Sequence, residues 1–377
     1  MLWVAIRMLT GDKAKFYGLL FGIAFSTLLI TQQLTIFVNL LNLGAAGVYN
    51  NGNGEVFVMD PVSTTTDVTY PMAITTLDQV RSVDEVEWAV PQLRTAAAVR
   101  TRQGGLEQVI IVGVDDATLT GMPKNIITGS KDMLRLPDTV IVDDVGSTRL
   151  FPSLNPIGQE LELNDRRAVV RGIADTTPGF SSTAVLYTTY SQALGYVPGT
   201  RNRMSLIVAS PRAGTTSEEL VTAIEKATKL KARTREEFAR DGIQFIIENT
   251  GIPFNFGITV ALGFIVGVAI VGLTFSLFIR DNIKQFGALK AIGVTNKTLK
   301  KMVTVQAGLV GLIGYGFGVL ATIGTLKAFS SNPFFKGFFV PWQVPLISLA
   351  AVIAILSFTA WIAMRRVLKT EPAEVFR

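Results

Sequence analysis

Residues 16–43 read FYGLLFGIAFSTLLITQQLTIFVNLLNL, a run of 28 residues without a charged side chain. As an α-helix this run spans about 42 Å, which exceeds the ~30 Å hydrocarbon layer of a membrane. A charge at mid-bilayer costs at least ~2.5 kcal/mol, so the lack of charge matters as much as the length. The run is also longer than the roughly 7–15 apolar residues of a cleavable signal peptide. It therefore predicts a transmembrane helix.

Three further charge-free stretches lie in the last third of the chain, at residues 254–279, 302–326 and 338–364. Each is long enough to span the hydrocarbon layer as a helix. About 200 mostly polar residues separate the first stretch from the second. We therefore predict a membrane protein with four transmembrane helices and a large extracytoplasmic mixed α/β domain, residues 44–250, between helix 1 and helix 2.

The distribution of charge predicts the orientation. Residues 1–15, 280–301 and 365–377 together hold 13 basic and four acidic residues, whereas residues 44–250 hold 20 basic and 25 acidic residues. Basic residues concentrate in the short cytoplasmic segments of membrane proteins. We expect a multi-pass protein of the bacterial plasma (inner) membrane with both termini and the 280–301 loop in the cytoplasm. The net charge of +6 is thus a sign of topology, and we expect no nucleic-acid partner.

The composition excludes several kinds of chemistry. The chain contains no cysteine and no histidine. It therefore has no disulfide, no thiol nucleophile and no Ser-His or Cys-His hydrolytic site, and zinc would find only carboxylates. Two adjacent carboxylate pairs, Asp115–Asp116 and Asp143–Asp144, are candidate metal ligands, but each is more typical of a turn or helix start after a strand. We predict no catalytic residue and no metal site, with an enzymatic outer domain as a minor alternative.

The large domain shows short runs rich in β-branched residues, bounded by Gly, Pro and Asp, which are typical of strands. The predicted strands are Glu55–Met59, Ala96–Thr101, Gln108–Val114, Thr139–Val142, Glu160–Leu163, Ala168–Ile173, Ala184–Tyr187 and Met204–Ala209. The predicted helices are Leu77–Val83, Asp144–Phe151, Tyr190–Leu194 and Ser217–Thr228. Asn164–Asp165 predicts a hairpin turn. The length allows two subdomains, but the sequence does not place their boundary.

Two segments near the membrane show amphipathic or polar patterns. Residues 235–250 predict an amphipathic helix that joins the outer domain to the second span, with a hinge at Gly251–Pro253. The second half of the first span carries the polar residues Gln32, Gln33, Asn39 and Asn42. These residues fit either a helix that extends into the outer domain or a polar contact between helices. Residues 1–15 fit either an amphipathic interfacial helix or a basic flank.

Small residues are spaced four apart in the second and third spans. The pairs are Gly263/Gly267 and Gly314/Gly318. Such pairs allow close approach of helix backbones, so we assign these four glycines to helix packing, either within the bundle or between subunits.

The loop at residues 280–301 carries the most specific pattern. Ile283, Phe286, Leu289 and Ile292 recur at helical intervals, and Gly293 is expected to end this helix. Thr295 or Asn296 would then cap the helix that enters the third span. The sequence predicts a short amphipathic helix whose apolar face is exposed toward a partner or the membrane surface.

This loop resembles the cytoplasmic loop of the FtsX/MacB-type ABC transporter permeases, which is a coupling helix that docks onto the ATPase. The residues that carry the resemblance and the coupling role it implies are Arg280, Lys284, Gln285, Phe286, Gly287, Leu289, Lys290, Ala291, Ile292 and Gly293. The family also shares the order of one span, a large outer domain and three spans. Asn155–Gln159 with Val170–Ile173 is similar to the family's periplasmic domain, and Glu371–Glu374 is similar to its C-terminal tail.

Two departures from the family pattern affect the expected partners. Gln285 stands where the family often has Glu, which removes the acid of any docking salt bridge. MacB proper carries its own ATPase, whereas this chain lacks a G-x-x-x-x-G-K-[ST] phosphate loop. The resemblance therefore implies a non-catalytic subunit without a cofactor of its own, with ATP and Mg bound by a separate cytoplasmic ABC ATPase.

The resemblance also implies a function and a set of partners. A dimer of this chain would transmit ATP-driven motion of the coupling helices to the outer domains (mechanotransmission) and so export or extract a substrate from the periplasm or outer leaflet. Membrane lipids and a second copy are expected partners, and the family leaves room for a periplasmic adaptor and an outer-membrane channel. The alternative is an extracytoplasmic sensor or regulator of a cell-wall or envelope process without transport. The substrate cannot be read from the sequence.

Overall fold

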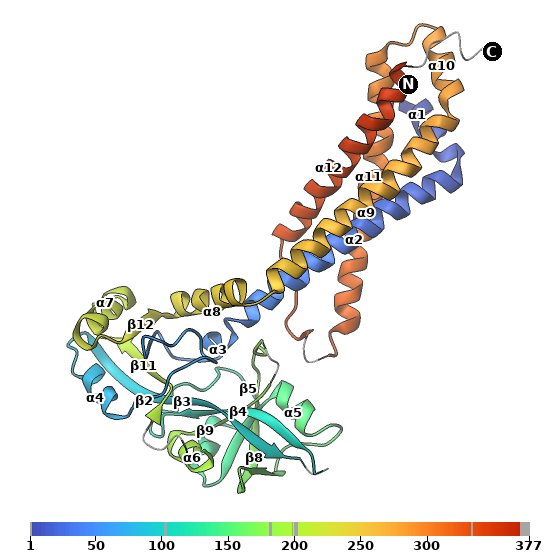
Figure 1. The fold of residues 1–377 in the computed structure, drawn as a ribbon. Helices are drawn as coiled ribbons and strands as arrows, with labels where there is room; N and C mark the ends of the chain where they lie inside the picture. Colours follow the sequence, from blue (N-terminus) through green and yellow to red (C-terminus); the bar gives the residue numbers. More distant parts are fainter. Residues whose placement is uncertain are drawn as a thin grey trace. The chain divides into compact units, whose positions relative to one another are not determined.

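The computed structural model describes residues 2–101, 104–180, 183–197, 199, 203–332 and 335–369 (Figure 1). The chain forms two compact units. The helical unit contains residues 1–39, 251–330 and 338–377, and the sheet unit contains residues 40–250 and 331–337. The Glu371–Glu374 tail motif lies outside the described residues.

The helical unit contains four helices that are long and apolar enough to cross a membrane. They are α2 (Lys13–Leu43), α9 (Ile252–Asp281), α11 (Asn296–Phe329) and α12 (Gln343–Lys369). The predicted fold class, four transmembrane helices with a large α/β domain between the first and second, is confirmed. Both α9 and α11 extend beyond the charge-free stretches. Polar and charged residues at the ends of a helix can remain helical outside the hydrocarbon layer, although they are costly inside it.

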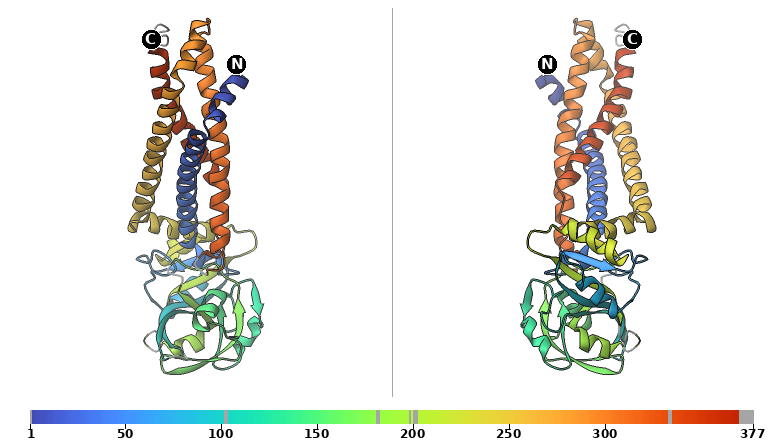
Figure 2. Two further views of the ribbon diagram at one scale, coloured as in Figure 1. Left: turned by 90° about the vertical axis from the view of Figure 1, so that its right-hand side faces the viewer. Right: turned by 90° about the vertical axis from the view of Figure 1, so that its left-hand side faces the viewer.

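Two shorter helices lie together at one end of this bundle, as both views in Figure 2 show. They are α1 (Leu2–Gly11) and α10 (Ile283–Ala291). Of the two alternatives for residues 1–15, the helix forms, over Leu2–Gly11. Ala5 and Leu9 are buried in the core of the helical unit, and Gln306 of α11 donates its Nε2–H to the carbonyl of Ala5 at 2.9 Å.

The sheet unit is built on a ten-stranded mixed sheet in the order β12-β1-β11-β3-β4-β9-β6-β8-β5, with β7 paired to β3 and β8. Its strands are β1 (Val56–Met59), β3 (Val86–Arg100), β4 (Leu106–Val114), β5 (Ile126–Thr128), β6 (Thr139–Asp143), β7 (Glu160–Leu163), β8 (Arg166–Ala174), β9 (Ala184–Thr189), β11 (Leu206–Pro211) and β12 (Lys231–Thr234). A small sheet pairs β2 (Met72–Ala73) with β10 (Arg203–Met204).

The helices of the sheet unit are mostly short. They are α3 (Ala46–Tyr49), α4 (Thr75–Arg81), α5 (Asp144–Leu150), α6 (Tyr190–Tyr196), α7 (Ser217–Thr228) and α8 (Arg235–Asn249), with a 3₁₀ turn at Lys131–Arg135. The predicted strand and helix segments all fall on observed elements of the same type, and α7 has the predicted bounds. Asn164 and Asp165 form the β7–β8 turn with φ values of 45° and 63°, as expected of a tight hairpin.

The long strand β3 joins the two halves of the sheet. Its first half pairs antiparallel with β11 up to Gln92, and its second half pairs antiparallel with β4 from Leu93 onward. Parallel pairing occurs between β4 and β9 and between β6 and β8. The two subdomains that the length allowed are therefore fused through one strand, and the unit is not divided at a linker.

Candidate functional site

The helix predicted to couple to a partner is α10, which is held at both ends. Asn282 lies at the corner between α9 and α10, where its Nδ2–H donates to the carbonyl of Phe278 at 2.8 Å. After α10, Gly293 has a φ of +91°, a left-handed value that favours glycine. Thr295 then accepts a hydrogen bond from the amide of Thr298 and caps α11. The predicted stop and cap are both confirmed.

The apolar face of α10 is not the exposed face that the sequence analysis expects. Phe286 is 2% exposed and packs into the core of the helical unit, and Leu289 packs partly against the same core. Helical periodicity correctly places these side chains on one face, but that face is covered by the chain's own spans. The expectation of an exposed Phe286 is therefore wrong, and this ring attaches α10 to the bundle.

Other residues on and around α10 are open, including Ile292, which the sequence analysis places on the same apolar face as Phe286. Ile292, at the end of the helix, is 76% exposed, which is high for a large aliphatic side chain. Arg280, Lys284 and Gln285 are also exposed, while Gly287 is buried and Lys290 is partly buried. The residues predicted for coupling thus divide into a buried attachment and an exposed basic surface that ends in Ile292.

A hollow of about 520 Å³ separates α1 from the α9–α10 corner. Trp3, Arg7, Asp281 and Gln285 are among its lining residues. On the same side, the ammonium group of Lys15 forms ion pairs with Asp12 and Asp281. The start of α2 and the end of α9 are thus fixed to each other beside α10.

The four glycines assigned to helix packing all lie at close approaches within the bundle. A Cβ atom at Gly314 would lie 2.8 Å from Ile23, and one at Gly318 would lie 2.5 Å from Thr27, both on α2. A Cβ at Gly267 would lie 2.3 Å from Ser26 Oγ, and Gly263 packs on the next turn of α2. Ser26 Oγ also donates to the Gly263 carbonyl at 2.9 Å. Of the two predicted roles, these contacts fit packing of α9 and α11 on α2 in the same chain.

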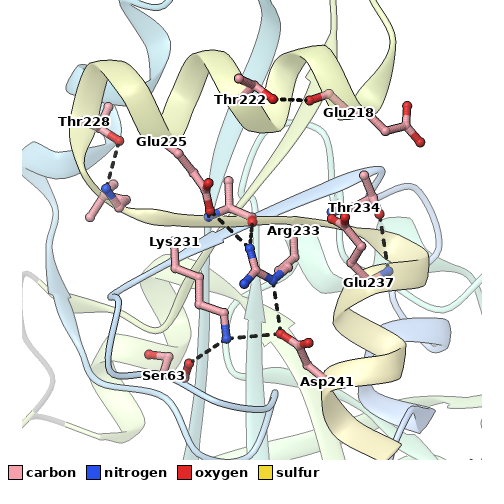
Figure 3. A network of polar contacts seen from close by, with 12 residues as sticks. Ser63, Glu218, Thr222, Glu225, Thr228, Lys231, Arg233, Thr234, Glu237 and Asp241 are labelled. Carbon is pink, nitrogen blue, oxygen red and sulfur yellow. Dashed lines mark hydrogen bonds and ion pairs between the residues drawn. The ribbon is translucent and has the colours of Figure 1, made fainter. Parts of the chain in front are cut away.

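In the sheet unit, a polar network fixes helix α8 to the sheet (Figure 3). Arg233 of β12 donates to Asp241 of α8 and to Glu225 of α7, each at 3.2 Å. Lys231 also pairs with Asp241 at 3.1 Å, so one carboxylate takes two cations. A capping box between Thr234 and Glu237 starts the helix. The sequence analysis predicts this helix but not the network, whose members lie on three separate elements.

A second contact fixes α8 to the chain that follows α2. A Cβ at Gly242 of α8 would lie 2.3 Å from the carbonyl oxygen of Gly44, and a Cβ at Gly44 would lie 2.8 Å from that of Gly242. Only glycine permits this backbone contact. The last turn of α2, from Leu40, belongs to the sheet unit. This fits the first of the two alternatives for the polar half of this helix, namely that it extends into the outer domain. Asn39 exchanges two hydrogen bonds with the backbone of Phe339, of 2.7 and 3.2 Å.

The segment 331–337, between α11 and α12, belongs to the sheet unit. Its Lys336 forms ion pairs with Asp144 and, at 2.6 Å, with Asp175, and it donates to the Thr176 carbonyl at 2.9 Å. Burial lowers the pKa of Lys336, but its bonds to the two carboxylates outweigh burial and raise it. The chain passes between the helical unit and the sheet unit at four points, next to residues 40, 250, 331 and 337.

The two carboxylate pairs have structural partners. Asp115 accepts bonds from Thr118 in a turn, and Asp116 accepts the amide of Ser191 at 3.1 Å at the start of α6. Asp143 caps α5, accepting the amides of Gly146 at 3.0 Å and Val185 at 2.8 Å. Burial raises the pKa of Asp143 to about 7 despite these two donors. Within the described residues, no group of three or more acidic side chains could hold a metal ion.

Two family models match most of the chain. The MacB-like periplasmic core domain matches residues 18–227, which is more than half of the chain, and the FtsX-like permease C-terminal domain matches residues 257–372. The order of these two matches follows the order of the sheet unit and of the last three spans.

Two curated relatives align with most of this chain. The chain is 21% identical over 301 residues to a macrolide export ATP-binding/permease protein MacB of Agrobacterium fabrum, and 24% identical over 286 residues to the MacB of Burkholderia lata. These alignments cover 77% and 73% of this chain but only 46% and 40% of the relatives, so the chain spans less than half of their length.

Two solved outer domains also align. The periplasmic region of MacB from Actinobacillus actinomycetemcomitans is 15% identical with a TM-score of 0.37, over 53% of this chain and 95% of that structure. The extracellular domain of the ABC-type transporter YknZ is 15% identical with a TM-score of 0.36, over 48% of this chain and 99% of that structure. The family models, together with the four spans, establish that the chain belongs to the FtsX/MacB-type ABC transporter permeases.

Proposed function

We propose that the chain is the non-catalytic membrane subunit of an ATP-driven exporter, acting as one of two copies, with ATP and Mg²⁺ bound by a separate cytoplasmic ABC ATPase. In this proposal both termini and α10 face the cytoplasm of the inner membrane. The proposal rests above all on α10, a short basic helix between two spans that is attached to the bundle through the buried Phe286 and leaves Ile292 exposed.

The contacts around α10 suit the transmission of force. A push on α10 reaches α9 through the Asn282 corner and α2 through the Lys15–Asp281 ion pair. Four packing glycines bring α9 and α11 into close contact with α2. In the sheet unit, α8 is fixed by Asp241 and by the Gly44–Gly242 contact, so movement of the chain there would carry the sheet with it.

The cargo would be gripped by the sheet unit and not pass through the spans. The charge-free parts of the four helices offer no acidic or basic residue for a polar pathway. The relatives named for macrolide export make a hydrophobic compound the first cargo to test, with lipoprotein handling and control of a wall hydrolase as the other possibilities. A periplasmic adaptor and an outer-membrane channel belong to this proposal as optional partners.

The test is co-purification of an ABC ATPase with the full chain, using two matched substitutions. Ile292→Asp places a charge at the exposed end of α10, and Val62→Asp does the same at a loop residue of the sheet unit that is 75% exposed. We expect Ile292→Asp to reduce recovered ATPase at least tenfold, as at an interface hot spot, and Val62→Asp to leave it unchanged. Recovery of no ATPase with the unmodified chain, or equal recovery with both variants, would contradict the proposal.

A further inference from the structure

A groove of about 540 Å³ lies between α11 and α12, and it includes residues 300–308 near the start of α11, shortly after α10 in the chain. Its walls are mainly apolar and include Ile353, Leu356 and Trp361 of α12. The two helices touch at its closed end, where a Cβ at Gly311 would lie 2.3 Å from Leu356. One turn earlier, a Cβ at Gly308 would have no heavy atom within 4 Å, so the helices have separated there.

The open end of the groove is positively charged. Lys300 and Arg365 both line it; Lys300 precedes Lys301, which borders the charge-free stretch of α11, and Arg365 directly follows that of α12. These two side chains therefore mark the level at which the hydrocarbon layer gives way to lipid headgroups. The guanidinium of Arg365 stacks on Trp361, with its central carbon 3.6 Å from the ring centroid, which leaves the N–H groups at its edge available to an anion.

We propose that this groove binds an anionic phospholipid, with the phosphate at the Lys300–Arg365 end and an acyl chain along Leu356 and Trp361. The groove is mainly apolar where an acyl chain would lie, and its only charged lining residues are Lys300 and Arg365, which matches the two chemistries of such a lipid. A second copy of this chain would also cover apolar surface, but it would have to bury both cations, and α10 and the mouth of the groove offer few acidic residues to pair with them.

The experiment uses Trp361 as the reporter in the full chain, with Trp3, Trp88 and Trp342 replaced by Phe. The protein is reconstituted in phosphatidylcholine vesicles that contain a minor fraction of brominated phosphatidylglycerol or brominated phosphatidylcholine. Bromine quenches the indole only from lipid that lies against it. We expect several-fold stronger quenching by the anionic lipid at equal mole fraction. Equal quenching by the two lipids would overturn the proposal, and so would an absence of quenching by either, since another protein surface would then cover the ring.

Two pairs of variants separate charge from shape. Lys300→Gln should reduce the preference for the anionic lipid roughly fivefold, whereas Lys327→Gln, at the other end of α11, should not change it. Gly308→Leu should fill the groove and abolish the preference although both cations remain. Gly324→Leu is its control, because a side chain there also has open space. A preference that survives Lys300→Gln and Gly308→Leu would refute the assignment to this groove.

Discussion

Replacement of Asp143 by asparagine should change how the stability of the sheet unit depends on pH. The carboxyl is 1% exposed at the start of α5, and burial raises its pKa from 3.8 to about 7. A carboxyl whose pKa is raised in the folded state binds its proton more tightly there than in the unfolded chain. It therefore contributes most stability below pH 3.8, loses this contribution as the pH rises toward 7, and changes little above about pH 7.

The size of the effect follows from the two pKa values. Each pKa unit corresponds to about 1.36 kcal/mol, so a rise from 3.8 to about 7 corresponds to about 4 kcal/mol. Asparagine has nearly the same shape, and its carbonyl oxygen can accept the same bonds from Gly146 and Val185. We therefore expect the free energy of unfolding of Asp143→Asn, relative to the unmodified chain, to rise by about 4 kcal/mol between pH 4 and pH 8.

Urea unfolding of the full chain in detergent micelles would measure this difference, followed by the fluorescence of Trp88 of β3 with the other tryptophans replaced by Phe. Asp143→Ala serves as the second variant, because it removes the acceptor and the charge together. It should be less stable than Asp143→Asn by about 2–6 kcal/mol at every pH, because each of the two unpaired buried amides costs about 1–3 kcal/mol. A difference between Asp143→Asn and the unmodified chain that stays constant from pH 4 to pH 8 would refute the reasoning.

The remaining predictions concern the bundle and its attachments. Phe286→Ala should remove a buried ring and destabilise the packing of α10 by roughly 3–5 kcal/mol, seen as faster proteolysis within α10; unchanged proteolysis would mean that the ring does not hold this helix. Gly318→Leu should clash with α2 and lower the thermal stability of the purified chain by at least ~1–3 kcal/mol, whereas Gly324→Leu should not; equal stability would contradict tight packing there. Lys336→Met should increase hydrogen exchange in residues 331–337, because it removes the ion pairs with Asp144 and Asp175. Unchanged exchange would mean that these ion pairs do not stabilise the segment.

The sequence predicts most accurately where one dominant physical constraint acts along the chain. The spans follow from the cost of charge in a membrane, and the end of α10 follows from the left-handed conformation at Gly293. Strands with strong alternation are found, while β12 is missed because Lys231–Thr234 carries two charges in four residues. The first half of β3 is missed although it is buried, since Pro91 within it argues against a strand.

The errors in the candidate site have a different origin. Periodicity places Phe286 and Leu289 on one face of a helix, but it contains no information on whether a partner protein or the chain's own spans cover that face. Lys336 and Asp144 are 192 residues apart, and nothing local marks either one as the other's partner. The Gly44–Gly242 contact could not be predicted from the sequence either, because a glycine is compatible with close backbone approach but does not indicate which segment lies against it.

The connections of α8 differ in how tightly they are packed, and this difference determines how a movement of the spans would reach the sheet unit. Asp241 and the capping box hold α8 to the sheet, and Gly242 holds it to the chain after α2. By contrast, Gly251 between α8 and α9 is exposed, and a Cβ there would meet no heavy atom within 4 Å. A movement of α9 would therefore be absorbed at Gly251 unless α2 moves with it. The packing of Gly263 and Gly267 on α2 provides that connection, which makes α2, continuous from Lys13 to Leu43, the stiffer of the two routes.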